Sequence, residues 1–286
     1  MGSVFPRAWL IAPGLGYLAL FLLVPCLVLF GNAFFERGIY GGIDYEAATA
    51  ENFARAFDSL YLQILLRSAG IALLATALAV LVGYPTAYAI CLAPPRRQTF
   101  LLFVVMLPFW TNYLIRTYAW IVLLNRKGLV NEGLAAVGAV GEPLPLLYNA
   151  FAVILGLVYS YLPFVVLAIY SSLSRLDGSL IEAAEDLGAS GPRAFRDIVL
   201  PLTLPGVAAG AVFVFVLSIG NFVTPDLLGG GKFQMVGNLI YDQFLTARDW
   251  PFGAALAMIL IAIMLLLLFA QAVALSRSGA AAQQPA

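Results

Sequence analysis

Long runs without a charged residue dominate the chain and predict its architecture. A helix needs about 20 mostly apolar residues to cross the roughly 30 Å hydrocarbon core of a bilayer. Five charge-free runs exceed that length, and a sixth, which starts at Gln98, continues past Arg116 as an apolar stretch to Leu124. The pattern predicts an all-α integral membrane protein, one transmembrane domain over residues 1–286 with six helices. The expected spans are residues 8–33, 67–92, 99–124, 145–172, 202–225 and 251–275.

The remaining segments are expected to lie outside the hydrocarbon. The first apolar run exceeds the core of a cleavable signal peptide and lacks a cleavage site, so we expect it to be retained. Gly128–Gly141 is apolar but short, which favours an interfacial or surface helix over a seventh span. The loop from Phe35 to Tyr61 is expected to be partly helical, and the Ala- and Gln-rich tail, 278–286, disordered.

Arginine placement orients the spans. Arg96 and Arg97 stand side by side in a very short connection, where the bias of basic residues toward the cytoplasm is strongest. We therefore expect this connection, both termini and the loop at 173–201 to face the cytoplasm.

Composition then excludes several classes of function. The chain is 62% hydrophobic and 10% charged, with a mean hydropathy of +0.95, whereas a soluble domain is about half apolar and about 25% charged. Its 15 basic and 15 acidic residues balance, so no nucleic-acid partner is expected. Histidine is absent, and Cys26 and Cys91 lie in apolar runs, so we expect neither a metal site nor a cofactor.

The loop at 173–201 is too polar to span a membrane and carries helix signals. Ser179 and Glu182 have the spacing of a capping box, and Gly188 is placed to end that helix in the left-handed conformation. The first helix has an apolar stripe at helical spacing, formed by Leu180, Ile181, Ala184 and Leu187.

A second short helix is predicted after the glycine. Ser190 and Pro192 mark its start, and Leu200-Pro201 is expected to interrupt it where the fifth span begins. Two amphipathic helices would thus meet at a glycine elbow. Because such short helices are marginal in water, the elbow should dock against a partner.

At this spacing the loop resembles the EAA signature of the membrane subunits of binding-protein-dependent ABC importers. The matching residues are Glu182, Ala183, Ala184, Gly188, Ile198, Leu200 and Pro201. Further segments resemble the spermidine/putrescine branch of that family, and specifically the first of its two permeases. They are Gly83–Ala89, Leu107–Tyr118 and Arg248–Ala254.

The resemblance covers essentially the whole chain and implies an assembly. It implies the type I ABC importer permease fold in the bacterial inner membrane, among lipid, with a cytoplasmic coupling helix between spans 4 and 5. It also implies a second homologous permease, two ABC ATPase subunits and an extracytoplasmic solute-binding protein. The elbow would transmit ATPase closure to the spans. Alternatively, Glu182 only completes a capping box and Gly188 only ends a helix.

The chain itself is expected not to be an enzyme. Gly229-Gly-Gly-Lys232 is the segment closest to a phosphate loop, but Phe233 stands where a Ser or Thr should bind magnesium, and Asp226 stands at the first glycine position. ATP would be hydrolysed by the partner subunits.

A polyamine pathway needs carboxylates, carbonyls or aromatic faces for its ammonium groups. Candidate pathway or gate residues are Trp110, Asn112, Tyr113, Tyr118, Asn221 and Asp226. Alternatively, the aromatic residues anchor the interface and Asp226 only caps a span.

Arg116 and three prolines are further features of the spans. We expect Arg116 to form a structural salt bridge or to lie near the outer interface, because its insertion at a span centre is costly. Pro108, Pro163 and Pro205 are expected to break or kink their helices. The small residues Ala208–Ala211 would allow close packing against a neighbouring helix.

Other functions fit the sequence less well. An ABC permease for iron, a sulfur-containing solute or an opine-like compound remains an alternative. An ion-coupled secondary carrier would call for intramembrane carboxylates, and none lies clearly inside a span. A membrane enzyme would need a catalytic base or metal cluster that the sequence does not offer.

Overall fold

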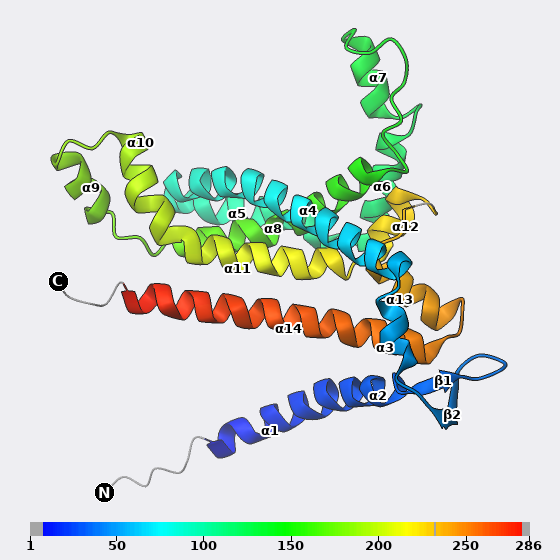
Figure 1. Ribbon diagram of the computed structural model, residues 1–286. Helices are drawn as coiled ribbons and strands as arrows, with labels where there is room; N and C mark the ends of the chain where they lie inside the picture. The colour runs from blue at the N-terminus through cyan, green and yellow to red at the C-terminus, as the bar shows by residue number, and fades with distance from the viewer. Residues whose placement is uncertain (1–7, 232, 282–286) are drawn as a thin grey trace, which may run out of the picture. The chain divides into compact units, whose positions relative to one another are not determined.

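The computed structural model describes residues 8–231 and 233–281. Lys232 of the Gly-rich turn and residues 282–286 of the expected tail lie outside the described residues. Nearly all regular structure is helical (Figure 1). The helices are α1 (Ala8–Leu18), α2 (Val24–Asn32), α3 (Glu51–Ala56), α4 (Ser59–Leu92), α5 (Pro95–Trp110), α6 (Tyr113–Leu124), α7 (Leu129–Ala136), α8 (Ala150–Leu173), α9 (Ser179–Asp186), α10 (Gly191–Ala194), α11 (Leu200–Ile219), α12 (Val223–Gly229), α13 (Val236–Leu245) and α14 (Trp250–Ala281).

Two π-helical turns and one hairpin complete the regular structure of the described residues. The turn η1 (Ala19–Leu23) joins α1 to α2, and η2 (Phe195–Val199) joins α10 to α11. Strands β1 (Phe35–Arg37) and β2 (Ile43–Ala48) pair antiparallel, with a shift of register after Phe35. The chain forms two compact units. Unit 1 is Met1–Gln63 with Leu239–Leu265, and unit 2 is Ile64–Asn238 with Leu266–Ala286.

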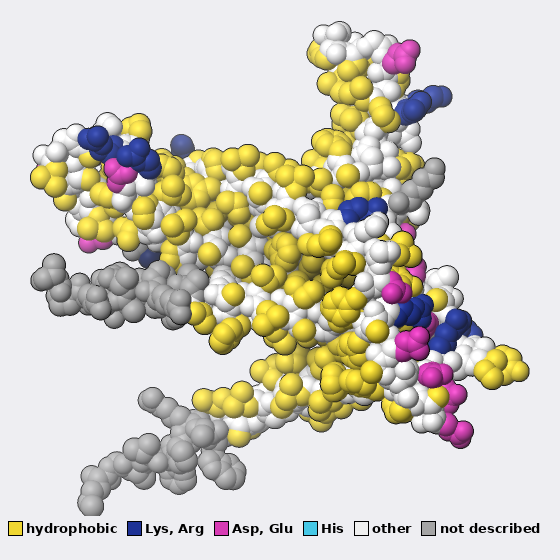
Figure 2. Space-filling model, in the orientation of Figure 1, with side chains coloured by type: hydrophobic (Ala, Val, Ile, Leu, Met, Phe, Trp, Pro, Cys, Tyr) yellow, Lys and Arg dark blue, Asp and Glu magenta, His cyan; other side chains and the backbone are white. Residues whose placement is uncertain are grey.

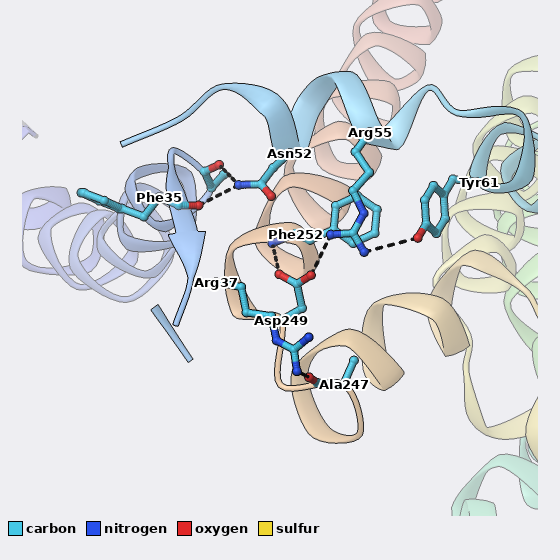
Figure 3. A network of polar contacts seen from close by, with 9 residues as sticks. Phe35, Arg37, Asn52, Arg55, Tyr61, Ala247, Asp249 and Phe252 are labelled. Atoms are coloured by element: carbon cyan, nitrogen blue, oxygen red, sulfur yellow. Dashed lines mark hydrogen bonds and ion pairs between the residues drawn. The ribbon is translucent and has the colours of Figure 1, made fainter. Parts of the chain in front are cut away.

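Unit 1 has a small core made of alanines. Ala33, Ala254 and Ala255 are fully buried, and Leu29, Phe53 and Phe244 pack around them. Asn52 of α3 donates hydrogen bonds to the carbonyl oxygens of Ala33 (2.9 Å) and Phe35 (2.8 Å), as Figure 3 shows. This amide fixes the chain where α2 ends and the hairpin begins. The loop is partly helical as expected, whereas the hairpin was not predicted.

Unit 2 is built around α8 and α11, which pack closely along their length. Gly206 of α11 makes this possible, because a Cβ there would lie 2.4 Å from Ser172 Cβ and 2.9 Å from the carbonyl oxygen of Ala168. At Gly210 the corresponding position lies 3.3 Å from Val165 Cα. Gly210 therefore allows the close helix packing that was predicted from the small residues Ala208–Ala211. The neighbouring helix is α8 of the same chain.

The lengths of the helices agree with a multi-pass membrane protein. Among the described residues, five helices have the length and hydropathy to cross a membrane, and a bent pair supplies a sixth if it counts as one span. These five are Ile11–Asn32, Ser59–Leu92, Ala150–Leu173, Gly191–Ile219 and Trp250–Val273. Hydrophobic side chains cover the helix flanks in Figure 2, and in unit 2 charged side chains gather at the α9–α10 end. The eight-residue α7 is too short to cross alone.

The third expected span is not one continuous helix. Pro95–Trp110 and Tyr113–Ala136 are bent by 88° at a break over residues 111 and 112. The Asn112 side chain starts the second helix by accepting hydrogen bonds from the backbone N–H groups of Leu114 (2.9 Å) and Ile115 (3.3 Å). The expected span at 99–124 is therefore a bent pair of helices rather than one continuous helix, and the bend follows the turn that contains Pro108, where a break or kink was predicted. The helix-starting role of Asn112 was not predicted, because hydropathy does not register it.

The prolines behave differently from one another. Pro108 lies in the last turn of α5, directly before the break. Pro163 and Pro205 lie inside α8 and α11, which both continue through them, so neither breaks its helix. The fifth span also ends earlier than expected, at Ile219, and α12 is a separate short helix.

Candidate functional site

The elbow at 173–201 begins with an aspartate rather than with the predicted serine. Ser179 is the first residue of α9 and makes no capping bond, so the Ser179/Glu182 capping box was a wrong prediction. Instead, Asp177 Oδ1 accepts a hydrogen bond from the backbone N–H of Ser179 at 3.0 Å. This bond holds the pKa of the Asp177 carboxyl below its usual range, because the N–H dipole favours the ionised form.

The end of α9 is a complete Schellman motif. Gly188 has φ +83°, the left-handed conformation that was predicted for it. Its N–H donates to the carbonyl oxygen of Glu185, and the N–H of Ala189 donates to that of Ala184, both at 2.9 Å. Free carbonyls at the helix end are thereby satisfied, and the direction of the chain after α9 is fixed.

After the glycine the chain enters the fifth span without interruption. Ser190 precedes α10 and makes no capping bond, and α10 continues through η2 into α11. Pro201 lacks an N–H and would clash in a regular α-helical turn. The π-helical turn directly before α11 widens the backbone hydrogen-bond pattern of the helix at this point. The helix therefore continues through Leu200-Pro201 with a π-bulge before it, where a break was predicted.

The residues of the EAA pattern lie mainly on an open face of the elbow. Glu182 and Ala183 are exposed, Ala184 is half-buried, and Gly188 is exposed. Leu187 ends the predicted apolar stripe, yet 89% of it is exposed. Ile198 and Leu200 are half-buried and Pro201 is exposed. The stripe is therefore only partly covered by the chain itself.

The end of the elbow at Phe195, which we call its root, packs by contrast against the core of unit 2. The ring of Phe195 meets the rings of Tyr84 and Tyr88 edge to face, with centroids 5.7 and 5.3 Å apart. The Tyr84 hydroxyl lies 2.9 Å from Thr203 Oγ1 of α11. Phe195 of η2 therefore connects the end of the elbow to α4, and Tyr84 connects α4 to α11.

A second cluster joins four polar side chains of unit 2. Asn221 is buried and donates hydrogen bonds to the phenolic oxygens of Tyr113 (2.7 Å) and Tyr161 (2.6 Å). Its Oδ1 accepts from the backbone N–H of Thr224 at 2.9 Å, and the Thr224 hydroxyl bonds to that of Tyr113. The cluster connects α6, α8 and α12 where α11 has ended.

Arg116 lies close to this cluster without a carboxylate. Its Nη1 donates to the carbonyl oxygen of Pro108 at 2.7 Å, and its guanidinium carbon lies 5.3 Å from the Tyr113 ring centre and 5.8 Å from that of Tyr159. The residue is buried and its Nε has no partner in the described chain. The expected salt bridge is therefore replaced by a carbonyl and two aromatic faces.

The six pathway candidates do not form one site. Tyr113 and Asn221 share the cluster, and Asn112 caps α6. Trp110 is 68% exposed and packs edge to face on Phe103. Tyr118 and Asp226 are exposed.

Sequence reasoning missed three residues of these sites. They are Asp177, Tyr161 and Thr224. Thr224 follows Asn221 at the spacing of an N-terminal capping interaction, which was a usable signal. Nothing local marks Tyr161, because its role depends on the rotation of α8.

Comparisons with known proteins agree with this architecture. Residues 79–278 match the family model described as binding-protein-dependent transport system inner membrane component. The spermidine/putrescine transport system permease protein PotB of Salmonella typhimurium (strain SL1344) is 43% identical over 253 residues, which cover 88% of each chain. The corresponding permease protein PotC of Escherichia coli (strain K12) is 29% identical over 255 residues, covering 87% of this chain and 88% of PotC.

The fold also has solved counterparts. A bacterial alginate ABC transporter, crystallised in complex with its alginate pentasaccharide-bound periplasmic protein, contains a chain that superposes with a TM-score of 0.71. The identity is 18%, and the match covers 93% of both chains. This is the all-α fold of an importer permease, and the apolar helices are those of a multi-pass membrane protein. The relatives that match the chain are permease subunits, which are components of transporters. The chain belongs to the family of binding-protein-dependent transport system inner membrane components, the permease subunits of ABC importers.

Proposed function

We propose that the chain forms half of the translocation pathway of an ABC importer for spermidine, putrescine or a related polyamine. The observation that carries the proposal is the 43% identity with PotB, which extends over 88% of both chains. The match extends over the loop at 173–201 as well as most of the spans, so it does not depend on one motif. This observation favours a polyamine over iron or an opine-like solute.

The same proposal includes a set of partners. A second, distinct permease would complete the pathway, which the similarity to PotC supports. An extracytoplasmic binding protein would deliver the solute, and two ATPase subunits would supply the energy. Both termini and the elbow would face the cytoplasm, and the β1–β2 hairpin the outside. No step of ATP hydrolysis would take place on this chain.

The elbow would be the part of the chain that receives the ATPase movement. Ala183 lets a partner approach closely, and Glu182 presents an unburied carboxylate beside it. The left-handed Gly188 fixes the angle between α9 and α10. Phe195 then connects this movement to Tyr84 and Tyr88 of α4. A rigid end and a packed root are the two properties that a mechanical coupling needs.

The Asn221 cluster would be part of the pathway or its gate. Hydroxyl and amide oxygens can replace water around an ammonium group as it enters the membrane. Tyr113 stands directly after the α5–α6 break and joins this helix to α12 through Thr224. Exchange of these hydrogen bonds between protein and solute would open and close the passage.

Reconstitution tests the proposal. The purified complex of both permeases, ATPase and lipid is placed in proteoliposomes, and ATPase activity and uptake of labelled spermidine are measured with the solute-loaded binding protein. We expect stimulation by spermidine or putrescine and none by ferric iron or an opine. Solute uptake by the chain without any ATPase would overturn the importer assignment, and stimulation by iron alone would overturn the polyamine assignment.

A further inference from the structure

Unit 1 holds a small pocket that the proposed transport cycle does not use. It has a volume of about 360 Å³ and lies between the β1–β2 turn and the junction of α13 with α14. Its walls include Tyr40, Phe244, Leu245, Arg248 and Trp250. The rings of Phe244 and Trp250 meet at 66° with their centroids 6.3 Å apart, which makes one wall aromatic.

The backbone around this pocket is held in an uncommon conformation. Arg248 has φ +52°, which costs a residue with a Cβ about 1–2 kcal/mol. Gly41 opposite has φ +90°, and a Cβ there would lie 2.7 Å from Arg248 Cβ. The Gly42 N–H donates to the Arg248 carbonyl oxygen at 2.8 Å, and Arg37 Nη2 donates to that of Ala247 at 2.7 Å (Figure 3). The surrounding contacts therefore hold a strained turn in place, as is common at binding sites.

The pocket exposes groups that normally find a partner. Tyr40, which lines the pocket at the tip of the hairpin, is 94% exposed, and so is its neighbour Ile39 outside the lining. In the described residues the Arg248 guanidinium makes no hydrogen bond and no ion pair. Aromatic walls beside an unpaired guanidinium are suited to bind a segment of another molecule in which a carboxylate follows an apolar or aromatic side chain.

The charges next to the pocket favour a protein over a membrane as its occupant. Glu36 and Glu46 are exposed on the two strands, and Asp44 faces Glu36 in the register of the hairpin. In unit 1, Asp and Glu side chains gather over the hairpin in Figure 2. An anionic lipid surface would be repelled by these carboxylates, whereas a protein can place basic residues at the rim of an apolar contact.

We propose that this pocket docks the extracytoplasmic solute-binding protein by taking up one apolar or aromatic side chain of it, with Arg248 pairing with an adjacent carboxylate. The proposal rests on the proposed function, which places the hairpin on the outer side. Tyr40 makes the main aromatic contact with the binding protein, and Arg248 forms an ion pair with its carboxylate. The carboxylates of the hairpin favour a partner surface with basic residues around this contact.

The test measures how much binding protein is needed to stimulate the reconstituted complex. ATPase activity is titrated with spermidine-loaded binding protein for the wild type, Tyr40→Ser, Arg248→Gln and the double variant. Tyr45→Ser is the control for the tyrosine, because Tyr45 is exposed on the same hairpin but does not line the pocket. Arg126→Gln is the control for the arginine, since Arg126 is exposed outside unit 1.

We expect the half-maximal concentration of binding protein to rise about tenfold in each single variant and further in the double one, as for a contact at the centre of an interface. Basal ATPase activity and complex assembly should stay unchanged, and both controls should remain within about twofold of the wild type. An unchanged titration of the double variant, with a stimulated wild type, would overturn the docking site alone. A wild type that no polyamine-loaded binding protein stimulates would refute the proposed function.

Two further outcomes would assign the pocket to another occupant. Loss of the second permease from the purified complex would make the pocket a contact between permeases. A shifted dependence of activity on lipid composition, with an unchanged titration, would make it a lipid contact. Either result would overturn the proposal.

Discussion

Arg55 of α3 donates a hydrogen bond of 2.8 Å to Asp249, which lies 194 residues later in the chain (Figure 3). Asp249 is almost fully buried and also accepts from the Phe252 N–H at the start of α14. The Arg55 guanidinium carbon stands 3.9 Å from the Phe252 ring centre. Burial opposes the charge on Arg55, but its hydrogen bonds to Asp249 and Tyr61 outweigh that effect and raise its pKa.

Arg55→Ala should therefore destabilise unit 1. The substitution leaves the Asp249 carboxylate buried without its cation, which costs about 1.5–3 kcal/mol for a hydrogen bond to a charged group. The thermal unfolding midpoint of the purified chain in lipid nanodiscs should fall. Arg126→Ala, at an exposed arginine without such a pair, should leave the midpoint unchanged, and an equal drop in both variants would refute the role of the pair.

Substitution at Gly188 should separate the shape of the elbow from its chemistry. Gly188→Val forces a β-branched residue into φ +83°, whereas Gly188→Asn places there a residue that tolerates the left-handed region. We expect binding-protein-stimulated ATPase activity to fall at least about tenfold in the valine variant, since strain of about 1–2 kcal/mol moves α9 away from its contact. The asparagine variant should keep most of the stimulation. Equal loss in both would mean that conformation is not what matters there.

Gly206→Ala should destabilise unit 2 through a specific clash. The new Cβ would meet Ser172 Cβ at 2.4 Å, and overpacking of this kind costs about 1–3 kcal/mol. Ser172→Gly removes that contact and should restore part of the loss in the double variant. Gly70→Ala is the control, because nothing lies within 4 Å of a Cβ at Gly70. Unfolding midpoints of the four variants in nanodiscs decide whether the two positions are coupled.

Loss of the Asn221 amide should affect both stability and transport. Asn221→Leu leaves the buried hydroxyls of Tyr113 and Tyr161 without their donor, which costs about 1–3 kcal/mol. Uptake of labelled spermidine should fall more than the amount of assembled complex. Tyr118→Phe, at an exposed tyrosine on the same helix as Tyr113, should have little effect. Full uptake by the Asn221 variant would remove the cluster from the pathway.

The stability of the start of α9 should depend on pH in one direction. The pKa of Asp177 is lowered by the Ser179 N–H, so its contribution is complete above the unfolded value of about 3.9 and is lost as pH falls through the lower folded value. Hydrogen exchange at the amide of Ser179, after correction for the intrinsic rate, should be unchanged from about pH 5 upward and faster below about pH 4. Asp177→Asn keeps an acceptor and should abolish the dependence. A persisting dependence in that variant would implicate another carboxyl group.

The sequence predicts best what depends on neighbouring residues. The continuous spans follow from runs of apolar residues, and the left-handed Gly188 follows from a glycine placed after a short amphipathic pattern. Ser179 was misassigned as the cap because two residues, Asp177 and Ser179, could each start α9, and the pattern does not decide which one does.

Contacts between distant residues were beyond sequence reasoning. Near Trp110 the local signal was only partly informative: Pro108 predicted a break or kink, whereas the start of a new helix at Asn112 was not predicted. The Asn221 cluster depends on how α6 and α8 are rotated, which a nearly uniform apolar pattern leaves open. The Arg55–Asp249 pair joins residues that no local signal connects.

The α5–α6 break also bears on how the protein is made. α6 has 12 residues and so extends about 18 Å, which is too short to cross the bilayer alone. Yet the Pro108 carbonyl oxygen accepts hydrogen bonds from the side chains of Thr111 and Arg116, which both lie within eight residues of it in the chain. Asn112 caps the start of α6. During synthesis this bent segment can therefore leave the insertion machinery with the Pro108 carbonyl oxygen and the first N–H groups of α6 already paired, before α8 has been translated.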